Sequence, residues 1–250
     1  MRYLIYLKYI GTNYCGWQVQ NNALSVQTVV QDAVEKVFCH RPDIKGCSRT
    51  DSGVHANMYC AHFDSEKEIP PRSVVLGMNI HLPDDVAVFD CKIVDDDFHA
   101  RYSCIEKEYI YLIHHSSYRD PFIEGRAYRR YGELDVEKLN EAAGYFCGTH
   151  DFSAFCSAGA KEGDKTRTVK YASVTKEGDM VIFKVCADGF LYNMVRIMAG
   201  TLLKVAQGKI NPEDIPAIIE SKDRNKAGGT APAVGLYLNE VRYSSQDELK

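Results

Sequence analysis

The sequence has 250 residues, of which 45% are hydrophobic and 26% are charged, and its formal net charge at pH 7 is −4. This length suits one large domain or two small, tightly joined ones, and the composition is typical of a globular protein rather than a disordered one. An indiscriminate nucleic-acid binder is usually basic overall, so the charge argues against that class, although local basic patches would still permit an RNA enzyme.

The cysteines indicate a reducing compartment. There are nine, and no two are spaced as C-x-x-C. An odd, scattered set argues against a disulfide framework, so we expect reduced thiols and a cytoplasmic protein. Cys60 and His62 share a face of one alternating segment, but two ligands do not make a zinc site, and we expect no metal. The sequence lacks signal-peptide features, and no stretch approaches the roughly 20 apolar residues of a membrane span.

Residue periodicity predicts five regular elements in the first part of the chain. The alternation over Arg2–Tyr9 predicts a strand. Apolar residues at helical spacing predict a helix over Val26–Phe38, which Ser25 is placed to cap. A polar loop over 46–56 leads to a strand at 59–63, a helix opened by the prolines at 70 and 71, and a strand over Val86–Val94.

The second part repeats this order loosely. Alternation predicts a strand over 107–115, and an amphipathic pattern predicts a helix over 135–146. Two strands around Gly178 form a predicted hairpin. A mostly apolar helix over 193–207, a helix over 212–221 capped by Asn211, and a closing strand over Leu236–Tyr243 complete the set.

These elements predict an α+β protein of two strand–helix–strand–strand halves, 1–104 and 105–250. No low-complexity linker separates the halves. We therefore expect a continuous mixed or antiparallel sheet flanked by helices, with a central cleft between the halves. Internal sequence repetition is not visible, so this pseudo-symmetry rests on the order of the elements.

The polar loop 46–56 concentrates residues that could do chemistry, namely Arg49, Asp51 and His55. The plain interpretation is an Asx-type turn, in which the Asp51 side chain bonds a nearby backbone amide. Taken alone, Asp-Ser-Gly is a common turn sequence, and this interpretation is favoured.

Two further residues stand out from their elements. Arg196 lies among apolar residues early in its helix, where a guanidinium needs a carboxylate partner or an anionic ligand, or else points to solvent beside Asn193. Periodicity leaves both possibilities open. Tyr109 shares a strand face with Tyr111, which is compatible with core packing or with stacking on an unpaired base.

A set of short motifs runs in one order along nearly the whole chain: Gly16-Trp17-Gln18, Ser25-Val26-Gln27, the loop 49–56, Asp97-Phe98-His99-Ala100-Arg101, Lys107-Glu108-Tyr109-Ile110-Tyr111, Asp151-Phe152-Ser153-Ala154-Phe155, Thr166-Arg167-Thr168, Asn193-Met194-Val195-Arg196, Thr230-Ala231-Pro232 and Gly235-Leu236-Tyr237-Leu238. In these motifs the chain resembles the TruA-type tRNA pseudouridine synthases. One motif would be weak support, whereas the ordered set is highly specific.

The resemblance implies a role for each matched residue. Asp51 corresponds to the catalytic aspartate, Tyr109 to the tyrosine that stacks on the target base, and Arg196 to the arginine that pairs with the aspartate. The N-terminal half would then carry the catalytic loop, and the C-terminal half would complete the cleft. Arg49, Leu236 and Tyr237 correspond to substrate-binding positions. We predict the same role for His55 of the loop 49–56 and for Arg126 and Arg167 of the basic clusters described below.

The resemblance also implies the substrate and the assembly. The family is an α+β homodimer with a basic cleft for tRNA. Its targets are uridines on the 3′ side of the anticodon stem-loop, at positions 38, 39 and 40. The isomerisation involves neither redox chemistry nor hydrolysis, so no metal or cofactor is expected.

Three basic clusters are candidates for RNA contacts, although a charge run is usually a solvated face. The first contains Arg126, Arg129 and Arg130 with Tyr128 and Tyr131, and the second contains Lys161, Lys165, Arg167 and Lys170. Given the resemblance, we predict that these two bind RNA. The third cluster, Lys222, Arg224 and Lys226, is left undecided.

Other functions remain open from the sequence. The same chemistry could act on ribosomal RNA, because the motifs describe catalysis better than target choice. A non-catalytic RNA-binding module is disfavoured because Asp51, Tyr109 and Arg196 are all present. A cysteine–histidine hydrolase is disfavoured because no nucleophile motif surrounds any cysteine.

Overall fold

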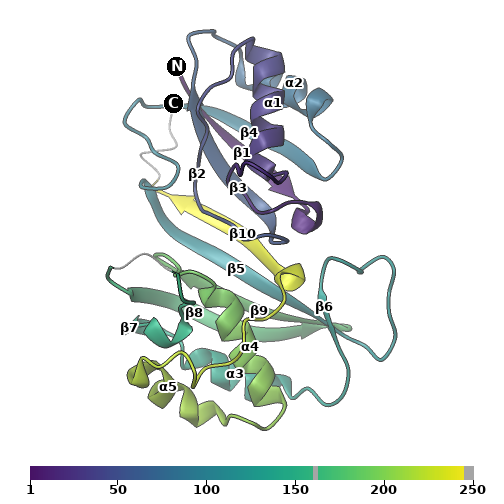
Figure 1. The fold of residues 1–250 in the computed structure, drawn as a ribbon, viewed down its shortest axis with the longest axis vertical. Helices are drawn as coiled ribbons and strands as arrows, with labels where there is room; N and C mark the ends of the chain where they lie inside the picture. Colours follow the sequence, from purple (N-terminus) through teal and green to yellow (C-terminus); the bar gives the residue numbers. More distant parts are fainter. Residues whose placement is uncertain (160–162, 245–250) are drawn as a thin grey trace. The chain divides into compact units, whose positions relative to one another are not determined.

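Figure 1 shows the computed structural model, which describes residues 1–159 and 163–244. The chain divides into two compact units. Unit 1 comprises Met1–Lys107 and Tyr237–Lys250, and unit 2 comprises Glu108–Leu236. The predicted boundary after residue 104 lies three residues before this division, and the last strand belongs with the first part of the chain.

Unit 1 has helices packed on a mixed sheet. Its elements are β1 (Arg2–Tyr9), α1 (Val26–Phe38), β2 (Lys45–Gly46), β3 (His55–Asp64), α2 (Pro71–His81), β4 (Val86–Val94) and β10 (Leu236–Tyr243), whose first residue lies in unit 2. The main strands follow the order β4-β1-β3-β10. β1 is antiparallel to both neighbours, whereas β10 runs parallel to β3.

Aromatic packing joins α1 to the sheet. The ring centroids of Tyr3, Phe38 and Phe63 lie 5.1 to 5.5 Å apart, and all three side chains are buried. Such rings remove large apolar areas from water and favour edge or offset contacts. Ser25 caps α1 as predicted, because its side chain accepts a hydrogen bond from the amide of Thr28 at 3.2 Å.

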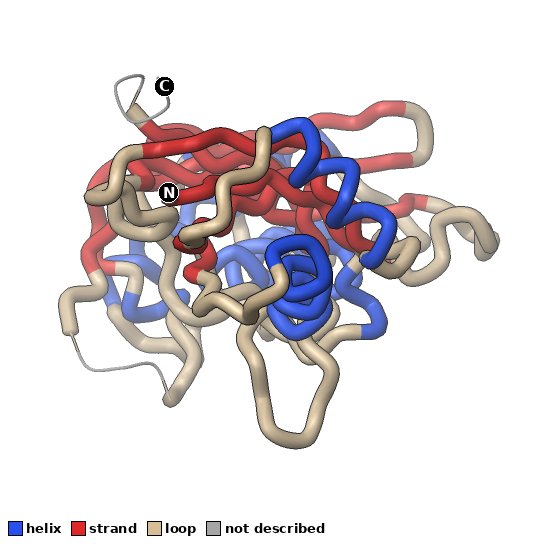
Figure 2. The backbone as a smooth tube through the Cα atoms, turned by 90° about the horizontal axis from the view of Figure 1, so that it is seen from above, coloured by secondary structure: helices blue, strands red, loops and turns tan. Residues whose placement is uncertain are grey.

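Unit 2 also packs helices against mixed strands. It contains most of β5 (Cys104–His115), followed by β6 (Tyr128–Arg130), α3 (Val136–Gly144), β7 (Gly148–Asp151), β8 (Thr166–Glu177), β9 (Met180–Ala187), α4 (Met194–Ala206) and α5 (Ile215–Ser221). The main strands follow the order β5-β9-β8-β7, and β6 runs parallel to β5. The alternation of helices, strands and loops can be followed in Figure 2, where helices are blue and strands red.

The predicted α+β class and the longer predicted elements are confirmed. The prediction of one helix over 212–221 was wrong in its first turn, because Pro212–Asp214 is a 3-10 helix and α5 begins at Ile215. Pro216 lacks the amide that would continue an α-helical bond to residue 212. Asn211 does cap this region through a capping box. The backbone amide of Asn211 donates to Oδ2 of Asp214 at 2.9 Å, and the Asn211 side chain accepts from the backbone amide of Asp214. The cleft between the halves stays a prediction.

Strands β2, β6 and β7 were not predicted. They have only two to four residues each, too few to show an alternation. In the part of the chain that the structure describes, no helix combines the length and apolar character needed to cross a membrane.

Candidate active site

Main-chain hydrogen bonds hold the loop that carries Asp51. The carbonyl of Thr50 accepts from the amide of Trp17, and the carbonyl of Tyr14 accepts from the amide of Gly53, both at 3.2 Å. Within the loop, the amide of Val54 donates to the carbonyl of Asp51 at 3.2 Å. The backbone on both sides of this half-buried aspartate is therefore tied to residues 14–17 of the same unit.

Gly16 allows these two segments to approach each other. Its φ of +87° is a conformation that side chains disfavour, and a Cβ at this position would lie 2.4 Å from the carbonyl oxygen of Thr50. Any larger residue would push the loop away. This contact explains why a glycine belongs to the Gly16-Trp17-Gln18 motif.

The first turn of α1 supports the same segment. Its amides have no acceptor within the helix. The amide of Val26 donates to the carbonyl of Gly16 at 3.1 Å, and the amide of Gln27 donates to that of Trp17 at 3.0 Å. The Trp17 ring stacks on Tyr59 of β3 with centroids 4.1 Å apart. Three motifs of the resemblance thus form one support for the Asp51 loop.

His55 lies in the interior of unit 1. Its Nδ1 accepts a hydrogen bond from the amide of Gly11 at 2.9 Å, and its ring stacks on Tyr237 with centroids 4.5 Å apart. The two residues are register partners in the parallel pair of β3 and β10. The structure thus joins two predicted substrate-binding residues, while the predicted RNA contact Arg49 is exposed on the preceding loop.

Tyr109 and Tyr111 are both buried on β5, as the predicted common face requires. The Tyr111 hydroxyl donates to the carbonyl of Pro232 at 2.9 Å. The rings of Tyr109 and Phe190 form a T-shaped pair, with centroids 5.1 Å apart and planes at 83°. Tyr111 is therefore a core residue, whereas Tyr109 lies beside the segment that leads into α4.

Arg196 is held along α4 rather than left in solvent. Its Nε donates to the carbonyl of Ala231 at 2.8 Å, and its Nη1 donates to Oδ1 of Asn193 at 2.9 Å. The amide of Ala231 donates back to the carbonyl of Arg196 at 3.0 Å. The Thr230-Ala231-Pro232 motif thus orients the guanidinium, and the half-buried side chain is not simply a solvated charge.

A close backbone approach makes this arrangement possible. A Cβ on Gly200 of α4 would lie 1.8 Å from the carbonyl oxygen of Gly229, so only glycine fits there. The amide of Gly228 donates to the Thr201 hydroxyl at 2.8 Å. Sequence reasoning missed this contact, although a lone glycine in an apolar helix and the pair Gly228-Gly229 were available signals.

The remaining predicted substrate-binding residues lie in unit 2. Arg167 folds back on its own turn, where Nη1 donates to the carbonyls of Asp164 and Thr166 at 3.1 and 2.6 Å. Arg126 is exposed on the loop before β6, and Leu236 is buried at the start of β10. Lys161 of the second basic cluster lies outside the described residues.

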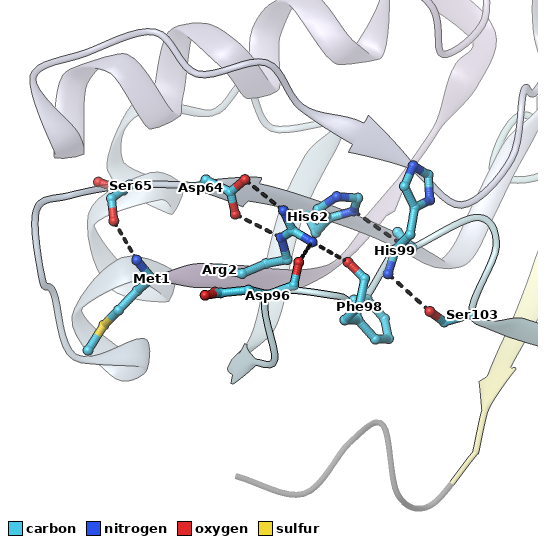
Figure 3. A network of polar contacts seen from close by, with 10 residues as sticks. Met1, Arg2, His62, Asp64, Ser65, Asp96, Phe98, His99 and Ser103 are labelled. Carbon is cyan, nitrogen blue, oxygen red and sulfur yellow. Dashed lines mark hydrogen bonds and ion pairs between the residues drawn. The ribbon is translucent and has the colours of Figure 1, made fainter.

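The Asp97–Arg101 motif has a supporting role in unit 1 (Figure 3). The Arg2 guanidinium makes two 2.8 Å hydrogen bonds to the Asp64 carboxylate, and its Nη1 donates to the carbonyl of Phe98 at 2.8 Å. His62 Nδ1 accepts from the amide of Ala100 at 3.1 Å. Burial, reinforced by His99 and Arg2, lowers the pKa of His62 to about 4.

Metal coordination finds no support in these positions. Across residues 1–159 and 163–244, no three His, Cys, Asp or Glu side chains are grouped so as to hold an ion. Cys60 is buried in β3, and His62 uses Nδ1 for the bond to Ala100.

The predicted site residues thus fall into two sets. Unit 1 holds Arg49, Asp51, His55 and Tyr237, and unit 2 holds Tyr109, Arg126, Arg167, Arg196 and Leu236. The meeting of the two sets in one site stays a prediction.

Comparison with known proteins covers nearly the whole chain. The profile of a family described as tRNA pseudouridine synthase matches residues 5–103 and 142–244. The tRNA pseudouridine synthase A of Acetivibrio thermocellus is 46% identical over 237 residues, covering 95% of this chain and 97% of that protein. The proteins of the same name from Caldicellulosiruptor saccharolyticus and Staphylococcus carnosus are 44% and 40% identical, covering 96% and 99% of this chain and 98% and 92% of their own lengths.

A structural comparison gives a weaker likeness. A chain from the crystal structure of a Cbf5-Nop10-Gar1 complex aligns at a TM-score of 0.39 with 12% identity. The alignment covers 94% of this chain and 57% of that one. A likeness at this level supports no conclusion about function.

Proposed function

Because the chain belongs to the tRNA pseudouridine synthase family, it is an enzyme that isomerises uridine to pseudouridine in tRNA, and we propose that its targets lie on the 3′ side of the anticodon stem-loop. The expected positions are 38, 39 and 40. The resemblance of the ordered motifs to TruA-type enzymes supports this choice, as does the name shared by relatives that match almost the full length.

Asp51 is the proposed catalytic carboxylate. The reaction breaks the N1–C1′ bond of uridine, turns the base, and joins C5 to C1′. An ionised carboxylate would either attack covalently or help uracil to leave. The observation that carries this assignment is the main-chain support of the Asp51 loop, because a reacting carboxylate must be held in place.

Arg196 is the proposed partner of that carboxylate. A guanidinium favours the ionised form of a neighbouring aspartate and orients it through charge-assisted hydrogen bonds. The bonds from Arg196 to Ala231 and Asn193 support the proposal, since they fix the orientation of its guanidinium.

Tyr109, Leu236 and Tyr237 are proposed to line the uracil pocket. The target base must leave its stack at a cost of roughly a few kcal/mol, and an aromatic platform recovers part of that cost. The burial of Tyr109 and Leu236 supports this role, because an apolar pocket would retain the detached uracil.

RNA contacts are proposed for Arg49, Arg126 and Arg167, with His55 supporting the pocket wall through Tyr237. The exposure of Arg49 and Arg126 suits phosphate contacts, which come from local basic groups even in a chain of net charge −4. We further propose that the enzyme acts in the cytoplasm as a homodimer. The reduced cysteines support the cytoplasmic location, and the family resemblance supports the homodimer.

Tritium release tests this function directly. Unmodified tRNA labelled at C5 of uridine is incubated with wild type and with Asp51→Asn, because pseudouridine formation frees the C5 hydrogen. Release by the wild type alone, with tRNA binding retained by the variant, is the expected result. Mapping the product would then test the three positions. Release only from ribosomal RNA would show that the substrate is ribosomal RNA rather than tRNA. Substantial activity of Asp51→Asn would show that Asp51 is not the catalytic carboxylate.

A further inference from the structure

Phe190 is the aromatic neighbour of the proposed base-stacking residue. The Tyr109 and Phe190 rings meet at 83°, with centroids 5.1 Å apart. This T-shaped geometry places the positive edge of one ring against the negative face of the other. Phe190 is only half-buried, although it lies between the buried strand β9 and the buried start of α4.

The segment that carries Phe190, residues 188–193, is anchored at its N-terminal end. The amide of Asp188 donates to the carbonyl of Thr168 at 3.2 Å, and Oδ1 of Asp188 accepts from the amide of Thr168 at 3.0 Å. A Cβ on Gly189 would contact the Arg167 side chain at 3.4 Å. The segment therefore begins against the Thr166-Arg167-Thr168 motif.

Its C-terminal end is anchored to Arg196. Asn193 accepts from Nη1 of Arg196 at 2.9 Å and donates to the Ser157 hydroxyl at 3.0 Å. The amide of Ser157 donates to the carbonyl of Tyr192 at 3.1 Å. One short segment of unit 2 thus begins beside Arg167 and contacts Tyr109 and Arg196, three residues far apart in the sequence that are proposed to serve the same reaction.

We propose that Phe190 is a positioning residue that fixes the ring plane of Tyr109 for stacking on the target uracil. This rests on the proposed function of Tyr109. A stacked base requires a platform of defined orientation, and the edge contact with Phe190 resists rotation of the tyrosine ring. Because segment 188–193 is bonded at both ends, Phe190 holds this orientation before RNA binds.

The test measures tritium release and tRNA affinity for variants at position 190. Phe190→Ala lowers kcat by about 10-fold, because a misoriented Tyr109 ring slows the chemical step. Kd for tRNA changes less than about 2-fold. Phe190→Tyr keeps the aromatic ring and restores kcat to near the wild-type value. Phe190→Leu, which keeps apolar volume but no ring, resembles Phe190→Ala and guards against misfolding of the smaller variant.

Phe183→Leu is the matched control. Phe183 is fully buried in β9, with its ring centroid 6.4 Å from that of Phe146, so its substitution lowers the unfolding temperature without lowering kcat of the folded enzyme. A weakened Kd with unchanged kcat for Phe190→Ala would make Phe190 an RNA contact and overturn the proposal. A full kcat loss in Phe190→Tyr would also overturn it.

A double-mutant cycle separates this inference from the proposed function. Tyr109→Ala should abolish most turnover, and adding Phe190→Ala should then cost little more, because the two residues act as a unit. Wild-type kcat in Tyr109→Ala would refute the role of Tyr109 itself. Loss in Tyr109→Ala with wild-type kcat in Phe190→Ala, or fully additive losses, would refute only the positioning role of Phe190.

Discussion

The two units hold their functional residues by different means. In unit 1, Asp51 lies on a loop that is fixed by main-chain hydrogen bonds and by the close approach of Gly16. In unit 2, Tyr109 and Arg196 lie on β5 and α4, and contacts of their own side chains orient them. Substitutions near Asp51 should therefore act through the backbone, whereas replacing Tyr109 or Arg196 in unit 2 should act on that side chain alone.

Among the variants that test this comparison and are not described above, the largest effect is expected for Arg196→Ala. We expect kcat for tritium release to fall about 10³-fold, because the variant loses the oriented guanidinium that is proposed to pair with the Asp51 carboxylate. Arg196→Lys should rescue little, since an ammonium cannot reproduce the Nε and Nη1 bonds to Ala231 and Asn193. Affinity for tRNA should change less than about 3-fold, measured by filter binding. Equal losses in kcat and affinity would make Arg196 a phosphate contact.

Gly200→Ala should break the support of Arg196 through the backbone. The added Cβ would collide with the carbonyl of Gly229, so we expect a loss of about 3 kcal/mol in unfolding free energy and lower kcat. Gly144→Ala at the end of α3 is the control, because nothing lies within 4 Å of its Cβ. Urea unfolding of both variants checks this. Equal unfolding free energies for the two variants would show that the close approach of Gly200 to Gly229 does not limit the residue at position 200.

Gly16→Ala should displace the Asp51 loop. It combines a positive φ with a collision against Thr50, and we expect a loss of about 2 kcal/mol in stability and a larger proportional loss in kcat. Gly178→Ala in the β8–β9 hairpin also has a positive φ, but its Cβ meets nothing within 4 Å. That variant should cost about 1 kcal/mol and leave kcat unchanged. A wild-type kcat in Gly16→Ala would contradict the role of the loop support.

The smallest effect is a pH dependence of unit 1. The pKa of His62 is about 4 in the folded protein, against 6.5 for a free side chain, so the unfolded state binds the proton first as pH falls. The stability that neutral His62 contributes is complete above pH 6.5 and is lost as the pH falls towards 4. We expect a loss of about 1 kcal/mol between about pH 7 and about pH 5.5.

His62→Asn supplies the comparison for this pH effect. The asparagine oxygen, attached to Cγ as Nδ1 is, can still accept from the amide of Ala100, but it does not titrate over this range. Unfolding free energies of wild type and variant, measured by urea titration at each pH, should therefore diverge as pH falls. Parallel curves would show that His62 contributes no pH dependence.

Much of the local structure was predictable because it depends on neighbours in the sequence. Helix α1 was predicted with its bounds and its Ser25 cap, and strands β1, β4 and β10 were also predicted over their full lengths. Asp51 was identified as a candidate from the polar loop and the motif order. The residues of that loop fit both an Asx-type turn and a catalytic site, so only the ordered motifs favoured the catalytic interpretation.

The tertiary structure decided what holds these residues. Arg196 was ambiguous from periodicity, and its acceptor, the carbonyl of Ala231, lies 35 residues along the chain. Phe190 carried no periodic signal, because it belongs to a loop whose conformation is set at both ends by other segments. The sequence by itself determined the longer elements, which follow from residue type and short spacing, and the candidate carboxylate, which follows from the order of the motifs. The orientation of the site residues depends on contacts between distant segments, which residue spacing does not encode.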